Sequence, residues 1–134
     1  MRFQRAQLPA LLNGHDAACQ FFAACFNSAK RRTERLWVAH VDESARCIHV
    51  ECYDGEPESV AIPVREIMAD AARLGSSGVV LAHNHPSGDS SPSPADCRAT
   101  RRLALAGEAI DLAVLDHLIF GSQSCSSMRR MGLL

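Results

Sequence analysis

The spacing of apolar and polar residues along the chain predicts helices and strands that follow one another in turn. Helical spacing between cap, proline and glycine signals predicts three helices. They are 16–30 with Asp16 as N-cap, 63–74 with Pro63 as first residue and Gly75 as stop, and 93–106 with Gly107 as stop. Shorter runs that alternate or are wholly apolar predict strands. These runs are 36–41, 47–52, 59–62, 78–82, 112–115 and 118–120.

Interleaved helices and strands of this kind indicate one α/β layered domain with a mixed β-sheet flanked by helices. A chain of 134 residues is the size of one domain and buries roughly two-thirds of its unfolded surface. We expect residues 1–15 to be an irregular N-terminal segment and 16–134 to be the domain. Segment 83–92 is expected to be a loop, and 126–131 a short closing helix.

Composition and charge exclude several classes of protein. Hydrophobic residues make up 47% and charged residues 22%, which is ordinary for a globular domain. No apolar run approaches the ~20 residues of a membrane helix, and no apolar stretch near the N-terminus resembles a secretory signal. We therefore expect a cytoplasmic chain. Its six cysteines form no CxxC pair, so they are expected to be reduced thiols rather than zinc ligands.

The segment from His83 to Asp96 carries the candidate chemistry. His83 and His85 are two residues apart at the end of an extended apolar run, so their side chains point to the same side. Asp96 follows near the start of the next predicted helix. Two histidines and one carboxylate leave a coordination position open for water, which is typical of catalytic zinc sites. These residues alone predict either a catalytic Zn²⁺ site at these three positions or, in the plainer interpretation, a pair of loop histidines that bind no metal.

This segment resembles the JAMM motif of JAB/MPN-type metallopeptidases, an upstream Glu followed by His-x-His, seven residues and Ser-x-x-Asp. His83, His85, Ser93 and Asp96 match that spacing without a gap. The flanks are similar to the RadC-like branch of this family, in the stretches VVLAHNHPSGD, PSPADCRATRRL, LDHLIFG and the closing GLL. The resemblance covers about residues 16–134. It includes neither the helix-hairpin-helix region of full-length RadC proteins nor the long insertion of some eukaryotic deubiquitinases.

The resemblance implies a JAB/MPN-like fold with cytidine-deaminase-like architecture, and a zinc-dependent hydrolase of amide bonds. It implies that His83, His85 and Asp96 bind zinc. By the same resemblance, Glu34 is the general acid/base and Ser93 donates to the oxyanion. The chemistry is consistent, because zinc lowers the pKa of bound water towards ~7 and a nearby carboxylate takes its proton. The implied substrate is a ubiquitin-like protein or its conjugates, processed or deconjugated beside conjugation enzymes, including those of bacterial antiphage systems.

Each of these residues also has a plainer structural interpretation. Ser93 and Asp96 have the spacing of a helix N-terminus, and a zinc-bound Asp96 would leave the reciprocal capping box incomplete. Glu34 is otherwise an exposed residue at a strand start. His117 is either a group that orients a metal ligand or, the reading we favour, a buried and hydrogen-bonded histidine. The other carboxylates considered as catalytic are Glu51 and Glu66.

A second functional hypothesis is a nucleic-acid-associated module, because RadC-like proteins take their name from DNA repair. A net charge of -1, one Trp and one Tyr give this hypothesis little support. Salt-sensitive DNA binding would favour it. A third is a metal-free scaffold, as in family members that lack the ligands, although all the ligand residues are present here. A zinc measurement separates it from the first.

Overall fold

The computed structural model describes residues 10–27, 33–55 and 61–134. Three helices and five strands alternate along this part of the chain. In order they are α1 (His15–Asn27), β1 (Arg35–Val41), β2 (Cys47–Asp54), α2 (Val64–Leu74), β3 (Gly78–Asn84), α3 (Pro94–Glu108), β4 (Ala113–Phe120) and β5 (Cys125–Ser127). No helix in the described ranges is long and apolar enough to cross a membrane.

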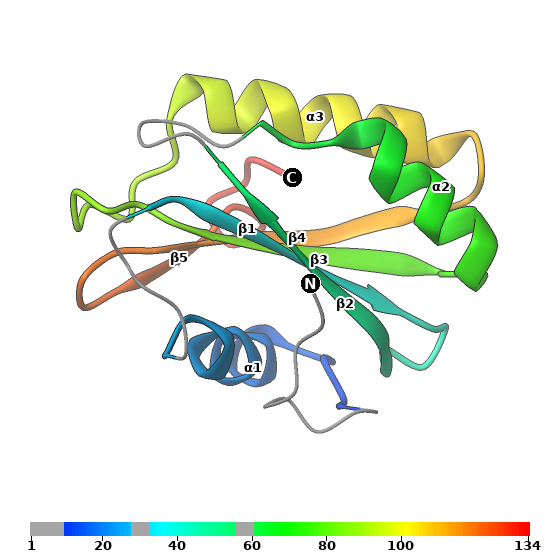
Figure 1. Cartoon of the computed structure of the whole chain (residues 1–134), viewed down its shortest axis with the longest axis horizontal. Helices are drawn as coiled ribbons and strands as arrows, with labels where there is room; N and C mark the ends of the chain where they lie inside the picture. Colours follow the sequence, from blue (N-terminus) through cyan, green and yellow to red (C-terminus); the bar gives the residue numbers. More distant parts are fainter. Residues whose placement is uncertain (1–9, 28–32, 56–60) are drawn as a thin grey trace.

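The strands form one mixed sheet in the order β2-β1-β3-β4-β5. β1 lies antiparallel to β2 and β3, whereas β3 and β4 are parallel and are connected through α3. Helix α1 covers one face of the sheet, and α2 and α3 cover the other (Figure 1). The predicted α/β domain with a mixed sheet flanked by helices is therefore confirmed.

The sheet has a hydrophobic core on each face, because successive strand residues point to opposite sides. In β3, Val80 and Ala82 pack in the core under α1, whereas Val79 and Leu81 pack in the core under α2 and α3. This two-sided burial explains why β3 is apolar at nearly every position, with no polar alternation. It also fixes the last residues of β3, which carry the candidate site.

A bulge in β4 changes which of its side chains face α3. Val79 pairs with Val114, but the next residue, Val80, pairs with Asp116, so Leu115 is an extra residue in β4. Val114 packs in the core under α2 and α3, and without the bulge Asp116 would follow it on that face. With the bulge, His117 takes the position that faces α3.

Three predicted helix boundaries were wrong for identifiable reasons. Helix α1 begins at His15, so Asp16 lies in its first turn, and the predicted end at residue 30 lies outside the described residues. Pro63 occupies the N-cap position of α2. Gly107 lies inside α3, which continues to Glu108. The residue is glycine because a Cβ there would come within 2.5 Å of the Leu112 carbonyl oxygen. This glycine permits a close approach and does not end the helix.

Several extended segments also differ from the prediction. β3 continues to Asn84, so His83 is a strand residue and not part of a loop. The two predicted strands near the C-terminus are one bulged strand, β4. The expected closing helix is instead β5 followed by turns. Of the strand predicted over 59–62, residues 61 and 62 are not in a strand, and the others lie outside the described residues.

Candidate metal centre

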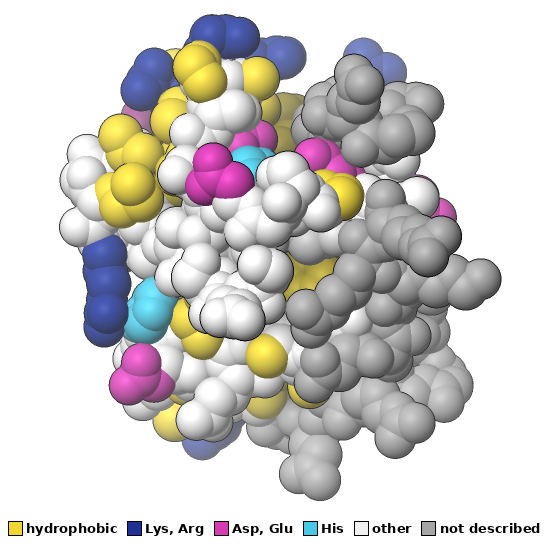
Figure 2. All heavy atoms as spheres, turned by 90° about the vertical axis from the view of Figure 1, so that its left-hand side faces the viewer, with side chains coloured by type: hydrophobic (Ala, Val, Ile, Leu, Met, Phe, Trp, Pro, Cys, Tyr) yellow, Lys and Arg dark blue, Asp and Glu magenta, His cyan; other side chains and the backbone are white. Residues whose placement is uncertain are grey.

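The three predicted metal ligands meet where β3 ends and α3 begins. His83 lies near the end of β3, His85 follows the strand directly, and Asp96 is the third residue of α3. Between the histidines, the Asn84 side chain accepts a hydrogen bond from the Arg35 amide at 2.8 Å and so holds β1 beside the site. Histidine and acidic side chains reach the surface side by side at this end of the molecule (Figure 2).

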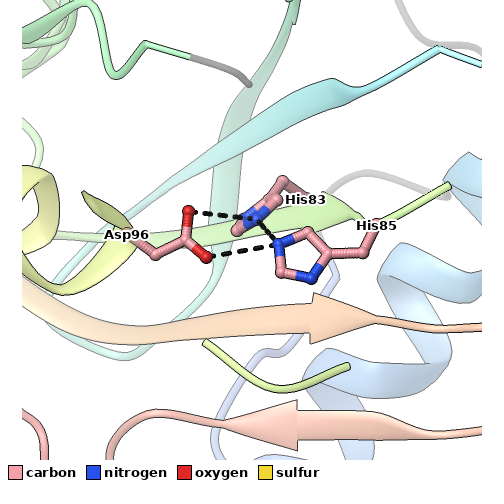
Figure 3. A group of neighbouring side chains, drawn as sticks. All are labelled: His83, His85 and Asp96. Atoms are coloured by element: carbon pink, nitrogen blue, oxygen red, sulfur yellow. Dashed lines mark hydrogen bonds and ion pairs between the residues drawn. The ribbon is translucent and has the colours of Figure 1, made fainter. Parts of the chain in front are cut away.

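The ligand atoms of this triad have the spacing expected around one metal ion. His83 Nε2 lies 2.9 Å from His85 Nε2 and 3.5 Å from Asp96 Oδ1 (Figure 3). His85 Nε2 lies 3.2 Å from Asp96 Oδ2. Ligands about 2.0–2.1 Å from a tetrahedral zinc lie roughly 3.3 Å apart. The residues present therefore fit a single metal ion of the size of zinc.

The hydrogen bond of His85 Nδ1 shows that the Nε2 atom of the ring is available to a metal ion. His85 Nδ1 lies 2.8 Å from the backbone carbonyl oxygen of Asp89. A carbonyl oxygen only accepts hydrogen bonds, so Nδ1 carries the proton of the neutral ring and Nε2 has a free lone pair. A metal ion accepts such a lone pair, and a histidine ligand commonly donates its other N–H to a carbonyl or carboxylate.

Asp96 serves the metal centre and the helix cap together, which corrects one expectation. The reciprocal capping box is complete, with the Asp96 amide donating to Ser93 Oγ at 3.0 Å and the Ser93 amide donating to Asp96 Oδ2 at 2.8 Å. A carboxylate oxygen has two lone pairs, so Oδ2 accepts the amide and still faces His85. Burial opposes its ionisation, but the contacts with His83 and with Ser93 outweigh burial and hold the pKa of Asp96 well below its usual range.

Ser93, the predicted oxyanion donor, lies beside the triad at the N-cap of α3. Its hydroxyl oxygen accepts the Asp96 amide. Its side chain also hydrogen-bonds the Asp96 carboxylate, which helps to lower the pKa of that group. Ser93 therefore caps the helix, and a rotation of its hydroxyl would direct the proton towards a substrate oxygen.

Glu34, the predicted general acid/base, is buried, although its position at a strand start suggested exposure. Glu34 is only 7% exposed and lies directly before β1. Burial raises the pKa of Glu34, the neighbouring His83 and His85 lower it, and Asp96 raises it again. Glu34 therefore lies within the electrostatic reach of all three ligands.

Neither alternative carboxylate belongs to this triad. Glu66 is exposed in the first turn of α2, where an acidic side chain stabilises the helix dipole. Glu51 lies on β2 beside His49, at 2.9 Å, and these two form a second group of potential ligands with Asp70. Asp70 already pairs with Arg73 at 3.2 Å, which places a positive charge next to that group.

The loop after His85 is fastened to the turn between β4 and β5. The Ser122 amide donates to the Gly88 carbonyl at 3.1 Å, and the hydroxyls of Ser90 and Ser124 are 2.8 Å apart. Gly121 allows this contact, because a Cβ there would come within 2.3 Å of the Gly88 carbonyl oxygen. The loop geometry that aims His85 therefore depends on residues distant in the sequence.

Sequence reasoning missed part of the site behind His83. His83 Nδ1 lies 2.6 Å from His117 Nε2, and His117 Nδ1 lies 2.7 Å from Thr100 Oγ1. His117 is buried and hydrogen-bonded, as we favoured, and its partner is the predicted metal ligand His83. Burial lowers the pKa of His117 well below its ordinary value. Thr100 carried no signal in the sequence, because its role depends on how α3 packs over β4.

Comparison with known proteins finds relatives of this chain among curated bacterial proteins. The chain is 34% identical to a UPF0758 protein of Roseiflexus castenholzii, over 96% of this chain and 49% of that protein. It is 42% identical to a UPF0758 protein of Chloroflexus aggregans, over 60% and 35% of the two chains. A UPF0758 protein of Symbiobacterium thermophilum is 41% identical, over 75% and 44%. The chain thus spans half or less of the length of these curated relatives.

The family match covers nearly the whole of the chain. Residues 12–133 match the family model described as the RadC-like JAB domain. This range contains the triad, Glu34 and Ser93, together with every strand of the sheet. The chain therefore belongs to the family of RadC-like JAB domains.

Proposed function

We propose that this domain is a zinc-dependent metallopeptidase that hydrolyses amide bonds after the C-terminal tail of a ubiquitin-like protein. The observation that carries the proposal is the convergence of His83, His85 and Asp96 with the spacing of one metal ion. A buried carboxylate, Glu34, within reach of their charges adds the group that a hydrolytic site needs.

Zinc bound at this triad supplies Lewis-acid chemistry, which acidifies water and polarises a carbonyl group. Glu34 is the base of the reaction, because its raised pKa suits a group that takes a proton from water and returns it to the leaving amine. Such proton transfer contributes typically 10²–10⁴-fold to a rate. Burial of Glu34 also limits competition from bulk water for its carboxylate.

Ser93 stabilises the developing oxyanion through its hydroxyl proton. The N-cap contact holds the hydroxyl oxygen in place without using that proton. A donor held in advance at such a site is worth about 3–4 kcal/mol of transition-state stabilisation. We therefore expect Ser93→Ala to lower kcat about 10²-fold while zinc content stays unchanged. A steady-state rate and a zinc assay on the same sample measure both.

The edge position of β2 among the described strands favours an extended substrate. β2 is the edge strand of the sheet, and its last residue, Asp54, pairs with Arg35 next to Glu34. An extended peptide that adds to this edge gains main-chain hydrogen bonds and needs few side-chain contacts. The flexible tail of a ubiquitin-like protein has this character, and glycines in the tail would pass close to the metal.

The test combines metal content with cleavage of a ubiquitin-like protein joined by its C-terminal residue to a fluorogenic amine. Glu34→Gln should retain zinc and lose at least about 10²-fold in rate, because it removes the base and keeps the shape. Asp96→Ala should lose both zinc and activity, since it removes a ligand. Glu66→Gln, an exposed carboxylate on α2, is the matched control and should change neither.

Two outcomes would contradict the proposal in different ways. Full activity in Glu34→Gln and in Asp96→Ala would exclude this mechanism. Zinc binding at the triad without cleavage of any ubiquitin-like substrate would retain the metal centre and reject the substrate.

A further inference from the structure

We propose that His117 and Thr100 form a hydrogen-bonded chain that fixes His83 as the tautomer able to bind metal through Nε2. Both are positioning residues, because neither lies at the point where the ligand atoms meet. The inference rests on the metal centre of the proposed function and not on the identity of the substrate.

The direction of every proton in the chain follows from its far end. Thr100 Oγ1 lies 2.7 Å from the backbone carbonyl oxygen of Asp96, which only accepts, so the single hydroxyl proton of Thr100 points there. The Met128 sulfur, at 3.8 Å, is a weaker and more distant acceptor. Thr100 Oγ1 must therefore accept a hydrogen bond from His117 Nδ1, 2.7 Å away.

The proton on His117 Nδ1 then sets the state of His83. A neutral imidazole carries one proton, so His117 Nε2 has a lone pair and accepts from His83 Nδ1 at 2.6 Å. With its proton on Nδ1, His83 directs the lone pair of Nε2 to the triad. His85 reaches the same state independently through the Asp89 carbonyl. The two Nε2 atoms, 2.9 Å apart, then carry no proton between them, and both lone pairs would be available to a cation.

The fold shows features that serve this contact. The bulge at Leu115 turns His117 towards α3, onto the face of the sheet that His83 shares with Leu81. Both histidines and Thr100 are essentially inaccessible to solvent, so water does not compete for these hydrogen bonds. Thr100 also links the chain to Asp96, whose carbonyl it contacts and whose carboxylate is a ligand. This hydrogen-bonded chain of His117 and Thr100, called the relay below, thus contacts two of the three predicted ligands, His83 and Asp96.

A matched pair of substitutions at Thr100 tests the inference through metal affinity. Thr100→Val keeps the shape of the side chain and removes the hydroxyl, whereas Thr100→Ser keeps the hydroxyl. Groups that orient a metal ligand typically contribute 10–100-fold to affinity. We expect the valine variant to bind zinc at least about 10-fold more weakly, and the serine variant within about 2-fold of wild type. Competition with a chromophoric chelator measures both values.

Nitrogen NMR of the histidine rings tests the tautomers directly and does not depend on how a variant folds. In the wild-type protein we expect His83, His85 and His117 each to carry a proton on Nδ1. A proton on Nε2 of His117 would overturn the proposal. Equal zinc affinity of folded Thr100→Val and Thr100→Ser would also overturn it.

These outcomes separate the positioning role from the proposed function. Failure to cleave ubiquitin-like substrates, with the expected zinc affinities and tautomers, would reject the substrate and keep the relay. A wild-type protein that binds no zinc would reject the metal centre and the relay together.

Discussion

Buried histidines in this domain differ in their hydrogen-bond partners. His117 and His83 are hydrogen-bonded to each other, whereas His40, the second-last residue of β1, makes a hydrogen bond between its Nδ1 and Ser76 Oγ at 2.9 Å. Its Nε2 has no partner among the described residues. Burial, and then the nearby His49, lower the pKa of His40 to about 4. A proton on that ring would place an unsolvated charge in the core.

This burial predicts acid sensitivity that does not involve the metal centre. The unfolded chain takes up a proton at His40 near pH 6.5, whereas the folded chain resists it down to about pH 4. Stability therefore falls as pH falls through this range, by about 2 kcal/mol between pH 7 and pH 5. His40→Gln should remove that part of the pH dependence in urea unfolding of the zinc-free protein.

A second variant separates the burial of His40 from the charge beside it. Because burial is the larger cause of the lowered pKa of His40 and His49 the smaller, His49→Gln should reduce the slope of stability against pH less than His40→Gln does. If the slope of stability against pH is unchanged in His40→Gln, groups other than His40 cause the loss of stability at low pH.

At the scale of elements, the metal centre depends on a contact between a loop and a turn that are far apart in the sequence. The loop after His85 lies against the turn that joins β4 to β5, and Gly121 is where the two backbones come closest. A methyl group at this glycine would overlap the Gly88 carbonyl and the Ser90 amide. Backbone atoms cannot yield as a flexible side chain does.

Gly121→Ala should therefore weaken both folding and zinc binding. Overpacking of this kind typically costs 1–3 kcal/mol, which chemical denaturation measures. A shifted loop also moves His85, so zinc affinity should fall in the same variant. Gly14→Ala is the control, because a Cβ there has no neighbour within 4 Å among the described residues, and it should change neither quantity.

The elements also show what the sequence could predict. His83, His85 and Asp96 lie in one short segment, so strand alternation and a helix start were enough to bring them together. The contact between His83 and His117 was not predictable, because it depends on a bulge that adds one residue to β4. Gly107 was misread because a glycine that ends a helix and one that allows a close approach have the same local pattern.

Over the whole molecule, the two faces of the sheet are covered unequally. Helices α2 and α3 share one face, and within the described ranges α1 alone covers the other (Figure 1). Three phenylalanines fill the space between α1 and the sheet, and Phe22 is fully buried. They are Phe21, Phe22 and Phe26. These large side chains give a single helix enough apolar area to hold its face.

Phe22→Ala should accordingly be one of the most destabilising single changes outside the site. Truncation of a buried phenylalanine typically costs 3–5 kcal/mol, which equilibrium unfolding measures. Leu105→Ala, whose side chain is 62% exposed on α3, should change stability by less than about 0.5 kcal/mol. A loss of stability in Phe22→Ala as small as that in Leu105→Ala would mean that the packing of α1 contributes little to the stability of the fold.

The short spacing of the ligands has a thermodynamic consequence for the unfolded chain. All three come from residues 83–96, whereas several groups that hold them in place come from β4, from α3 and from the turn between β4 and β5. An unfolded chain keeps the ligands close together and loses only their orientation, so it retains some affinity for metal. Binding to the unfolded state offsets the stabilisation that a ligand gives to the folded state. Zinc should therefore raise the melting temperature of this domain by less than its affinity for the folded protein implies.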